Sequence, residues 1–161
     1  MDKILNASKG VKAAQRLKLK KKKVVIVGGI FDILHIGHIR FLQKAKRCGD
    51  YLFVLLESDK RARIDKGSSR PINNQKERAE ILASINFVDY VITLENTLTN
   101  EEYDRLIYKL KPDLIALTKE SSTKQHAKRQ ALRLGAKVLE VIPRIKNKST
   151  TKVADIISKS F

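Results

Sequence analysis

The sequence is short of several features that would point to particular classes of protein. It has one cysteine, Cys48, which excludes an internal disulfide and a multi-cysteine metal site. So little cysteine is typical of a reducing compartment, and we expect the cytoplasm. No apolar run approaches the roughly 20 residues that a membrane-spanning helix needs, so we expect no membrane insertion. Residues 1–23 contain no apolar core and no cleavage-like site, which argues against a secretory signal.

Acidic residues are also scarce relative to basic ones. The 161 residues include 34 Lys and Arg against 17 Asp and Glu, for a formal net charge of +17. Such a balance favours anionic partners, including nucleotides, phosphorylated metabolites, nucleic acid and acidic membranes. Nearly half of the excess lies in residues 1–23, where Asp2 is the only acid. We therefore expect residues 1–22 to form either a basic arm or a short amphipathic helix, with weak binding to polyanions.

Apolar runs alternate with amphipathic segments from residue 23 onward. The apolar runs predict five buried strands, at residues 24–27, 51–56, 90–94, 114–117 and 137–142. Apolar residues spaced so as to share one helix face predict helices at 36–48, 76–85, 101–110, 122–134 and from 149 or 150 to about 159. Residues 65–75 are rich in turn formers and are predicted to be a loop.

The alternation predicts the architecture of residues 23–161. Strands that are apolar throughout and alternate with helices form parallel sheets that are covered on both faces. We therefore predict a single α/β, Rossmann-like domain with a parallel sheet of about five strands and helices on both faces. Ligands in such folds bind beyond the C-terminal ends of the strands, where the helices begin.

The first predicted strand runs directly into a segment whose residues can carry chemistry, at 28–38. It contains Gly28, Gly29 and two histidines, His35 and His38, at the start of a helix. Glycines let a phosphate approach the backbone, and a helix N-terminus attracts an anion. The two histidines are three residues apart and can point the same way. The segment predicts a phosphate pocket rather than a metal site, because the only other histidine is His126.

The same segment resembles the signature of the cytidylyltransferase-like nucleotidyltransferase family, a strand followed by G-x-F-D-x-x-H-x-G-H. Every position of that signature is matched, by Gly29, Phe31, Asp32, His35, Gly37 and His38. Residues 66–73 with Arg78 resemble a segment of the adenylyltransferase domains of ADP-heptose synthases. Residues 144–152 resemble the C-terminal signature of glycerol-3-phosphate cytidylyltransferases. The resemblance spans roughly residues 23–160.

The resemblance implies a reaction and a set of site residues. A nucleoside monophosphate would pass from ATP or CTP to a sugar phosphate or polyol phosphate, with release of pyrophosphate. The implied catalytic residues are His35, His38 and Lys66. The implied nucleotide-binding residues are Gly29, Ile30, Phe31, His35, His38, Arg144, Ser149, Thr150 and Thr151. Candidates for binding the acceptor are Asp32, Arg78 and Glu120, of which Asp32 could instead be structural.

The resemblance also implies a cofactor and an assembly, and it leaves a second hypothesis open. Mg²⁺ is expected to arrive with the nucleotide, held by its phosphates and few protein ligands, and a homodimer is expected. Three positions depart from the family pattern: Ile30, residues 118–121 and Asn147. They leave ATP or CTP, and the acceptor, undecided. The second hypothesis is a nucleotide-binding or nucleic-acid-binding module on an altered fold, against which the intact histidine pair argues.

Overall fold

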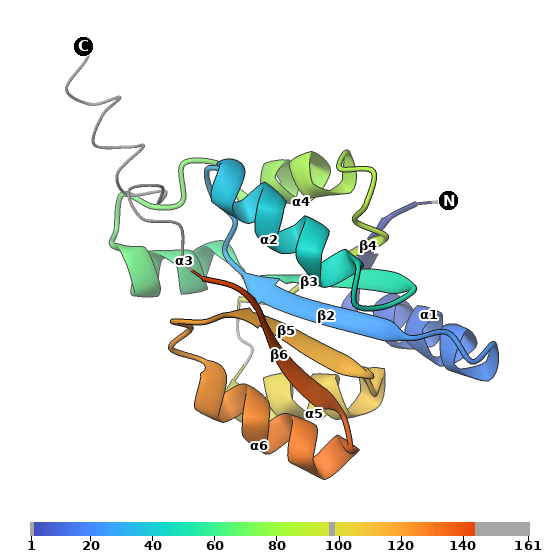
Figure 1. Cartoon of the computed structure of the whole chain (residues 1–161). Helices are drawn as coiled ribbons and strands as arrows, with labels where there is room; N and C mark the ends of the chain where they lie inside the picture. The colour runs from blue at the N-terminus through green and yellow to red at the C-terminus, as the bar shows by residue number, and fades with distance from the viewer. Residues whose placement is uncertain (1, 97–98, 144–161) are drawn as a thin grey trace.

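The structure, a computed structural model, describes residues 2–96 and 99–143 (Figure 1). Within these residues the chain forms one six-stranded sheet in which every neighbouring pair is parallel. The strands are β1 (Ile4–Asn6), β2 (Val24–Gly29), β3 (Tyr51–Leu56), β4 (Tyr90–Thr93), β5 (Leu114–Thr118) and β6 (Lys137–Ile142). The predicted α/β, Rossmann-like architecture is confirmed, with one strand more than the five expected.

Helices cover both faces of the sheet and divide the core into two layers. One face carries α2 (Ile36–Lys46) and α4 (Gln75–Ala83). The other carries α1 (Ala7–Leu19), α5 (Asn100–Leu110) and α6 (Lys124–Leu134). Because side chains alternate along a strand, Val25 and Val27 of β2 enter the first layer, while Val24 and Ile26 enter the second.

The N-terminal segment is part of this sheet, which settles the choice between an arm and a helix. β1 pairs with β4, with Ile4 opposite Val91. The side chain of Asn6 then caps α1 by accepting the Lys9 backbone N–H at 2.9 Å. Ala14 and Leu17 of α1 lie in the core. The sequence pattern did not predict β1 because three residues are too short to show a strand period.

Two further segments were predicted differently or lie beyond the described residues. Residues 59–66 form a helix, α3 (Asp59–Lys66), which begins at a Ser58 cap and takes in the start of the predicted loop. It was missed because only Ala62 of this helix is buried, so no apolar stripe marks it. The helix predicted from residue 149 or 150 lies outside the described residues.

The strand order places a ligand site at one point of the sheet. It reads β1-β4-β3-β2-β5-β6, so the chain runs from β2 outward through β3 to β4 and then returns to β5 on the other side of β2. A crevice opens beyond the C-terminal ends of the two strands where the direction reverses. These strands are β2 and β5, the first and fourth of the strands predicted from the sequence.

Candidate active site

The loop that joins β2 to α2 folds back on itself at Phe31. Phe31 lies in the left-handed region, with φ of 48°, and its ring packs over Gly29. A Cβ atom at Gly29 would lie 2.8 Å from a carbon of that ring, so this position requires glycine. The Phe31 ring is buried and meets the His38 ring edge-on, with centroids 5.3 Å apart. Phe31 therefore supports one of the two predicted catalytic histidines from behind.

The two histidines lie together at the start of α2. His35 is the N-cap of the helix, and its Nδ1 accepts the Gly37 backbone N–H at 3.1 Å. His38 lies one turn further on, and the two rings stack with centroids 4.0 Å apart. Because Nδ1 of His35 accepts a hydrogen bond, the neutral ring carries its proton on Nε2. The sequence prediction that both rings point to the same place is confirmed in geometry.

Burial changes the acid–base behaviour of His38. Its pKa falls from 6.5 to about 4, first because burial penalises the charged ring and second because His35 lies beside it. A backbone hydrogen bond with Ile33 acts in the opposite direction and is outweighed. In the protein without ligand, His38 is therefore neutral at pH 7.

The Asp32 carboxylate binds a loop that lies far from it in the sequence. The carboxylate is 4% exposed and pairs with Arg70, whose Nη2 lies 2.6 Å from Oδ2. It also accepts the backbone N–H groups of Ile72 and Asn73, at 2.9–3.0 Å. With so many partners, Asp32 is placed to hold residues 70–73 against the histidine loop, in line with the structural alternative for this residue.

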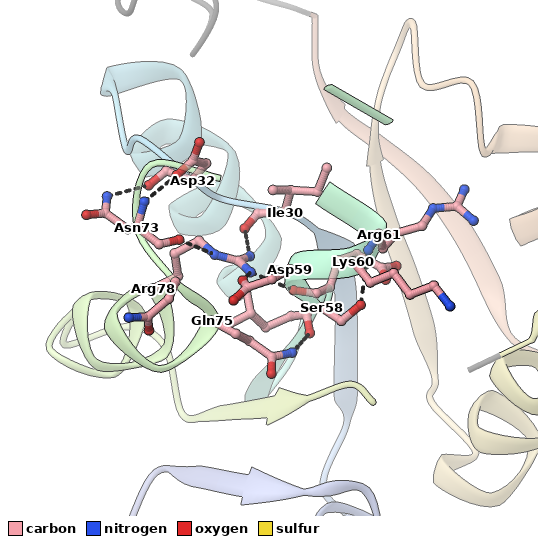
Figure 2. A network of polar contacts seen from close by, with 12 residues as sticks. Ile30, Asp32, Ser58, Asp59, Lys60, Arg61, Asn73, Gln75 and Arg78 are labelled. Carbon is pink, nitrogen blue, oxygen red and sulfur yellow. Dashed lines mark hydrogen bonds and ion pairs between the residues drawn. The ribbon is translucent and has the colours of Figure 1, made fainter. Parts of the chain in front are cut away.

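Arg78 likewise makes its contacts inside the protein. Its side chain is fully buried, and its guanidinium donates to the backbone carbonyls of Asn73, Glu57 and Ile30. It also pairs with Asp59 at 2.6 Å. Figure 2 shows the guanidinium between Ile30, Asp59 and Asn73. Arg78 does not line the cavity described below, so the structure gives it a supporting position rather than direct contact with an acceptor.

A cavity of about 930 Å³ opens at this edge of the sheet. Of the residues proposed from the sequence, those that line it are Gly29, Ile30, Phe31, Asp32, His35, His38, Lys66 and Glu120. Lys66 is exposed at the end of α3, and Glu120 is exposed after β5. The predicted nucleotide ligands Arg144, Ser149, Thr150 and Thr151 lie outside the described residues.

The cavity also exposes cations that the sequence reading had not assigned. Arg70 lines it with a side chain that is 9% exposed, and its buried Nε has no hydrogen-bond partner within the described residues. Lys60 and Arg61, from α3, line it as well. Arg70 lies inside the residue 66–73 segment that marked the family resemblance. That segment was therefore the available signal, although it could not say which of its cations faces the site.

The wall on the other side comes from α5 and α6. His126 and Gln130 of α6 line the cavity, and behind them Asp104 of α5 accepts from Gln130 at 2.6 Å and contacts His126 Nε2 at 2.8 Å. Burial acts to raise the pKa of Asp104, but the Gln130 hydrogen bond and the charges of His126 and Arg129 hold it below its ordinary value. Glu57, at the end of β3, also lines the cavity, and burial raises its pKa. The cavity therefore contains groups of both signs.

Among residues 2–96 and 99–143, no group of three or more His, Cys, Asp or Glu side chains is arranged to hold a metal ion. No helix in the same part of the chain is long and apolar enough to cross a membrane.

Comparison with known proteins gives one family match and several relatives. The family described as cytidylyltransferase-like matches residues 26–156. Bifunctional protein HldE of Wolinella succinogenes is 41% identical over 114 residues, which cover 71% of this chain and 23% of the relative. FAD synthase of Thermococcus sibiricus is 40% identical over 144 residues, covering 87% of this chain and 94% of the relative. The chain thus spans about a quarter of the HldE protein but nearly all of the FAD synthase.

Solved structures agree with the fold. A lipopolysaccharide core biosynthesis protein of Thermoplasma volcanium is similar with a TM-score of 0.61 and 28% identity, over 80% of this chain and 99% of that one. Pantoate–β-alanine ligase of Francisella tularensis has a TM-score of 0.60 at 19% identity, over 97% of this chain and 76% of that one, which supports the fold alone. The family match covers most of the sheet and the whole histidine segment. The chain belongs to the cytidylyltransferase-like family.

Proposed function

We propose that the chain transfers an adenylyl group from ATP to a phosphorylated small molecule and releases pyrophosphate. The observation that carries the proposal is the stacked pair of His35 and His38 at the start of α2, in one cavity with the buried cation Arg70. Two imidazole rings, a helix N-terminus and a fixed guanidinium favour an anion that gains charge as it reacts.

The proposed reaction is an in-line displacement. An oxygen of the acceptor phosphate attacks the α-phosphorus of ATP, and the bond from that phosphorus to the bridging oxygen of the β-phosphate breaks. Pyrophosphate leaves with the electron pair, so no covalent enzyme intermediate is needed. His35 donates from Nε2 to a phosphate oxygen, and His38 lies beside it with a ring that is neutral before ATP binds. Arg70 holds a positive charge in place because Asp32 orients it.

The choice of ATP and of the acceptor rests on the relatives. The FAD synthase is similar along almost its whole length. FAD consists of FMN joined to AMP, and FMN is itself a polyol phosphate that carries a flavin ring. We therefore place FMN first among acceptors of the polyol phosphate class, ahead of glycerol 3-phosphate and sugar phosphates. A cavity of about 930 Å³ lies in the range that binds small ligands.

Mg²⁺ is proposed to enter with the nucleotide. It would supply positive charge at the phosphates, as it commonly does in phosphoryl transfer. The carboxylate of Asp32 is already used by Arg70 and two backbone N–H groups, so it is poorly suited to a metal ligand. Lys66, Lys60 and Arg61 line the cavity as further charges for the phosphates.

A pyrophosphate-release assay tests the proposal. Each of the four nucleoside triphosphates is paired with FMN, glycerol 3-phosphate and heptose 1-phosphate in the presence of Mg²⁺, and products are weighed by mass spectrometry. We expect pyrophosphate and an adenylylated product only with ATP and an acceptor. Riboflavin, which lacks the phosphate of FMN, is the matched control and should give no product. Release with CTP instead of ATP would overturn adenylyl transfer, and ATP binding without release would favour the binding-module hypothesis.

The roles of the two histidines have their own test. Changing either His35→Ala or His38→Ala should lower turnover by roughly 10²–10⁴, the scale of one preorganised transition-state contact. Folding should persist in both variants, as checked by circular dichroism. Normal turnover in a folded variant would show that the altered histidine does not act in the reaction.

A further inference from the structure

Basic side chains collect at the edge of the sheet where the strands begin, opposite the cavity. Lys20, Lys21, Lys22 and Lys23 are all exposed in the turn from α1 to β2, at the right of Figure 1. The last turns of α2 and α5 and the start of β6 add further exposed cations: Lys44, Arg47, Lys109, Lys111 and Lys137. We call these nine side chains the basic edge.

The carboxylates at this end of the molecule already accept hydrogen bonds or form salt bridges within the protein. Asp113 accepts the Val24 backbone N–H and pairs with Lys18 at 2.7 Å. Asp89 accepts the Leu52 N–H and pairs with Lys46, also at 2.7 Å. Asp50 accepts the Lys23 N–H at 2.7 Å. The two salt bridges use lysines outside the basic edge, so its nine side chains keep most of their charge.

Distance separates the basic edge from the substrates. β2 and β3 each have six residues, so the two ends of the sheet lie roughly 20 Å apart at about 3.3 Å per residue. At physiological ionic strength the screening length is about 8 Å. Phosphates bound in the cavity would therefore feel little of this charge, and substrate binding does not account for it.

Two exposed leucines accompany the cations. Leu19 ends α1 and Leu132 lies in the last turn of α6, on the same face of the sheet. They are 86% and 85% exposed, the highest values among the large hydrophobic side chains of the described residues. Nucleic acid would instead be favoured by exposed aromatic rings, and the nearby Tyr51 and Tyr108 are half-buried.

We propose that the basic edge, with Leu19 and Leu132, is a docking surface for an anionic lipid bilayer. The lysines attract the negative surface, and the two leucines enter the headgroup region without any helix spanning the membrane. The cavity, at the opposite edge, would then face the aqueous phase and remain open to its substrates. The inference does not depend on which nucleotide or acceptor the enzyme uses.

Vesicle co-sedimentation of the full chain tests the proposal. We expect binding to vesicles of phosphatidylcholine with 30% phosphatidylglycerol as the chosen composition, no binding to phosphatidylcholine alone, and release as salt is raised. A variant with Lys20→Gln, Lys21→Gln, Lys22→Gln and Lys23→Gln should bind at least about tenfold less. The matched control removes four exposed lysines elsewhere and should bind nearly as the parent does: Lys9→Gln, Lys12→Gln, Lys76→Gln and Lys119→Gln.

The leucines separate a lipid surface from general attraction to polyanions. Changing Leu19→Ser together with Leu132→Ser should lower vesicle binding roughly fivefold or more and leave turnover unchanged. Ile81→Ser, at a 40% exposed position on the opposite face, is the apolar control. The proposal is overturned by equal loss in both lysine variants, by no loss in the leucine variant, or by binding to a single-stranded RNA but not to the vesicles. Circular dichroism confirms that each variant folds.

Discussion

Arg70 and Arg78 are both buried, but their guanidinium groups have different surroundings. Arg70 lines the cavity and keeps Nε without a hydrogen-bond partner in the described part of the chain. Arg78 uses its donors on three backbone carbonyls and on Asp59. In a chain with 34 basic residues, spacing alone cannot tell a ligand-binding cation from a supporting one. The assignment of Arg78 to the acceptor stays a prediction, although Arg70 lines the cavity and Arg78 does not.

Loss of the Arg78 side chain should therefore damage stability first. Arg78→Ala leaves a partly buried carboxylate and three carbonyls without their donor, and we expect a loss of about 3–5 kcal/mol in the free energy of unfolding. Arg78→Lys should recover only part of it, because an ammonium cannot reproduce the planar fork. Urea unfolding measures both. Arg61→Ala, which breaks the more exposed Asp65 pair, is the control and should cost below about 1 kcal/mol. An Arg78→Ala loss as small as that would contradict the supporting role.

His38 should make stability depend on pH in a defined window. Its pKa is about 4 in the folded protein and 6.5 in the unfolded reference, so between these values the unfolded chain binds a proton that the folded one does not. The free energy of unfolding should therefore fall as pH falls from 6.5 to 4, by up to about 1.4 kcal/mol per pH unit from this group. His38→Gln should flatten the curve in that window. Parallel curves for the two proteins, measured by denaturant unfolding, would show that His38 keeps an ordinary pKa.

At the scale of elements, the charged side chains of the helix α1 and the side chains that pack in the core lie on different faces. Leu17 is 8% exposed in the core layer that α1 shares with α5, whereas Leu19 is 86% exposed. The abundance of lysine in this segment made a solvated arm as reasonable as a helix. Pairing of β1 with β4 decides between them, because it ties the start of α1 to the sheet.

The two leucines provide a matched test of that packing. Leu17→Ala should lower the free energy of unfolding by about 2–3 kcal/mol, because it leaves a cavity in the core. Leu19→Ala, two residues away on the same helix, should change it by less than about 0.5 kcal/mol. Thermal unfolding of both variants measures the difference. Equal melting temperatures would mean that α1 does not pack on the sheet.

At the scale of the whole molecule, one cavity gathers residues from distant parts of the chain. The β2–α2 loop brings the histidines, the segment after α3 brings Arg70, and the α5–α6 wall brings His126 and Gln130. These segments meet because strand order reverses between β2 and β5.

Ligand-dependent melting should report that cavity. If adenylyl transfer is correct, ATP with Mg²⁺ at about 100 times its dissociation constant should stabilise the fold by roughly 2.7 kcal/mol. CTP at the same concentration should raise the melting temperature less, and adenosine should have little effect because it lacks the phosphates. His35→Ala should reduce the ATP shift. A larger shift with CTP would point to cytidylyl transfer.

The sequence alone determined the architecture, the histidine pair and the family. Each is carried by local patterns: apolar runs set the buried strands, and a glycine-rich turn before a helix sets the phosphate pocket. Only the tertiary structure decided which cations face the cavity, why His38 is neutral and how residues 4–6 join the sheet. Those properties depend on desolvation and on contacts between distant residues, such as Arg78 with Ile30, 48 positions apart. No local pattern encodes a partner at that separation, because the fold itself brings the two groups together.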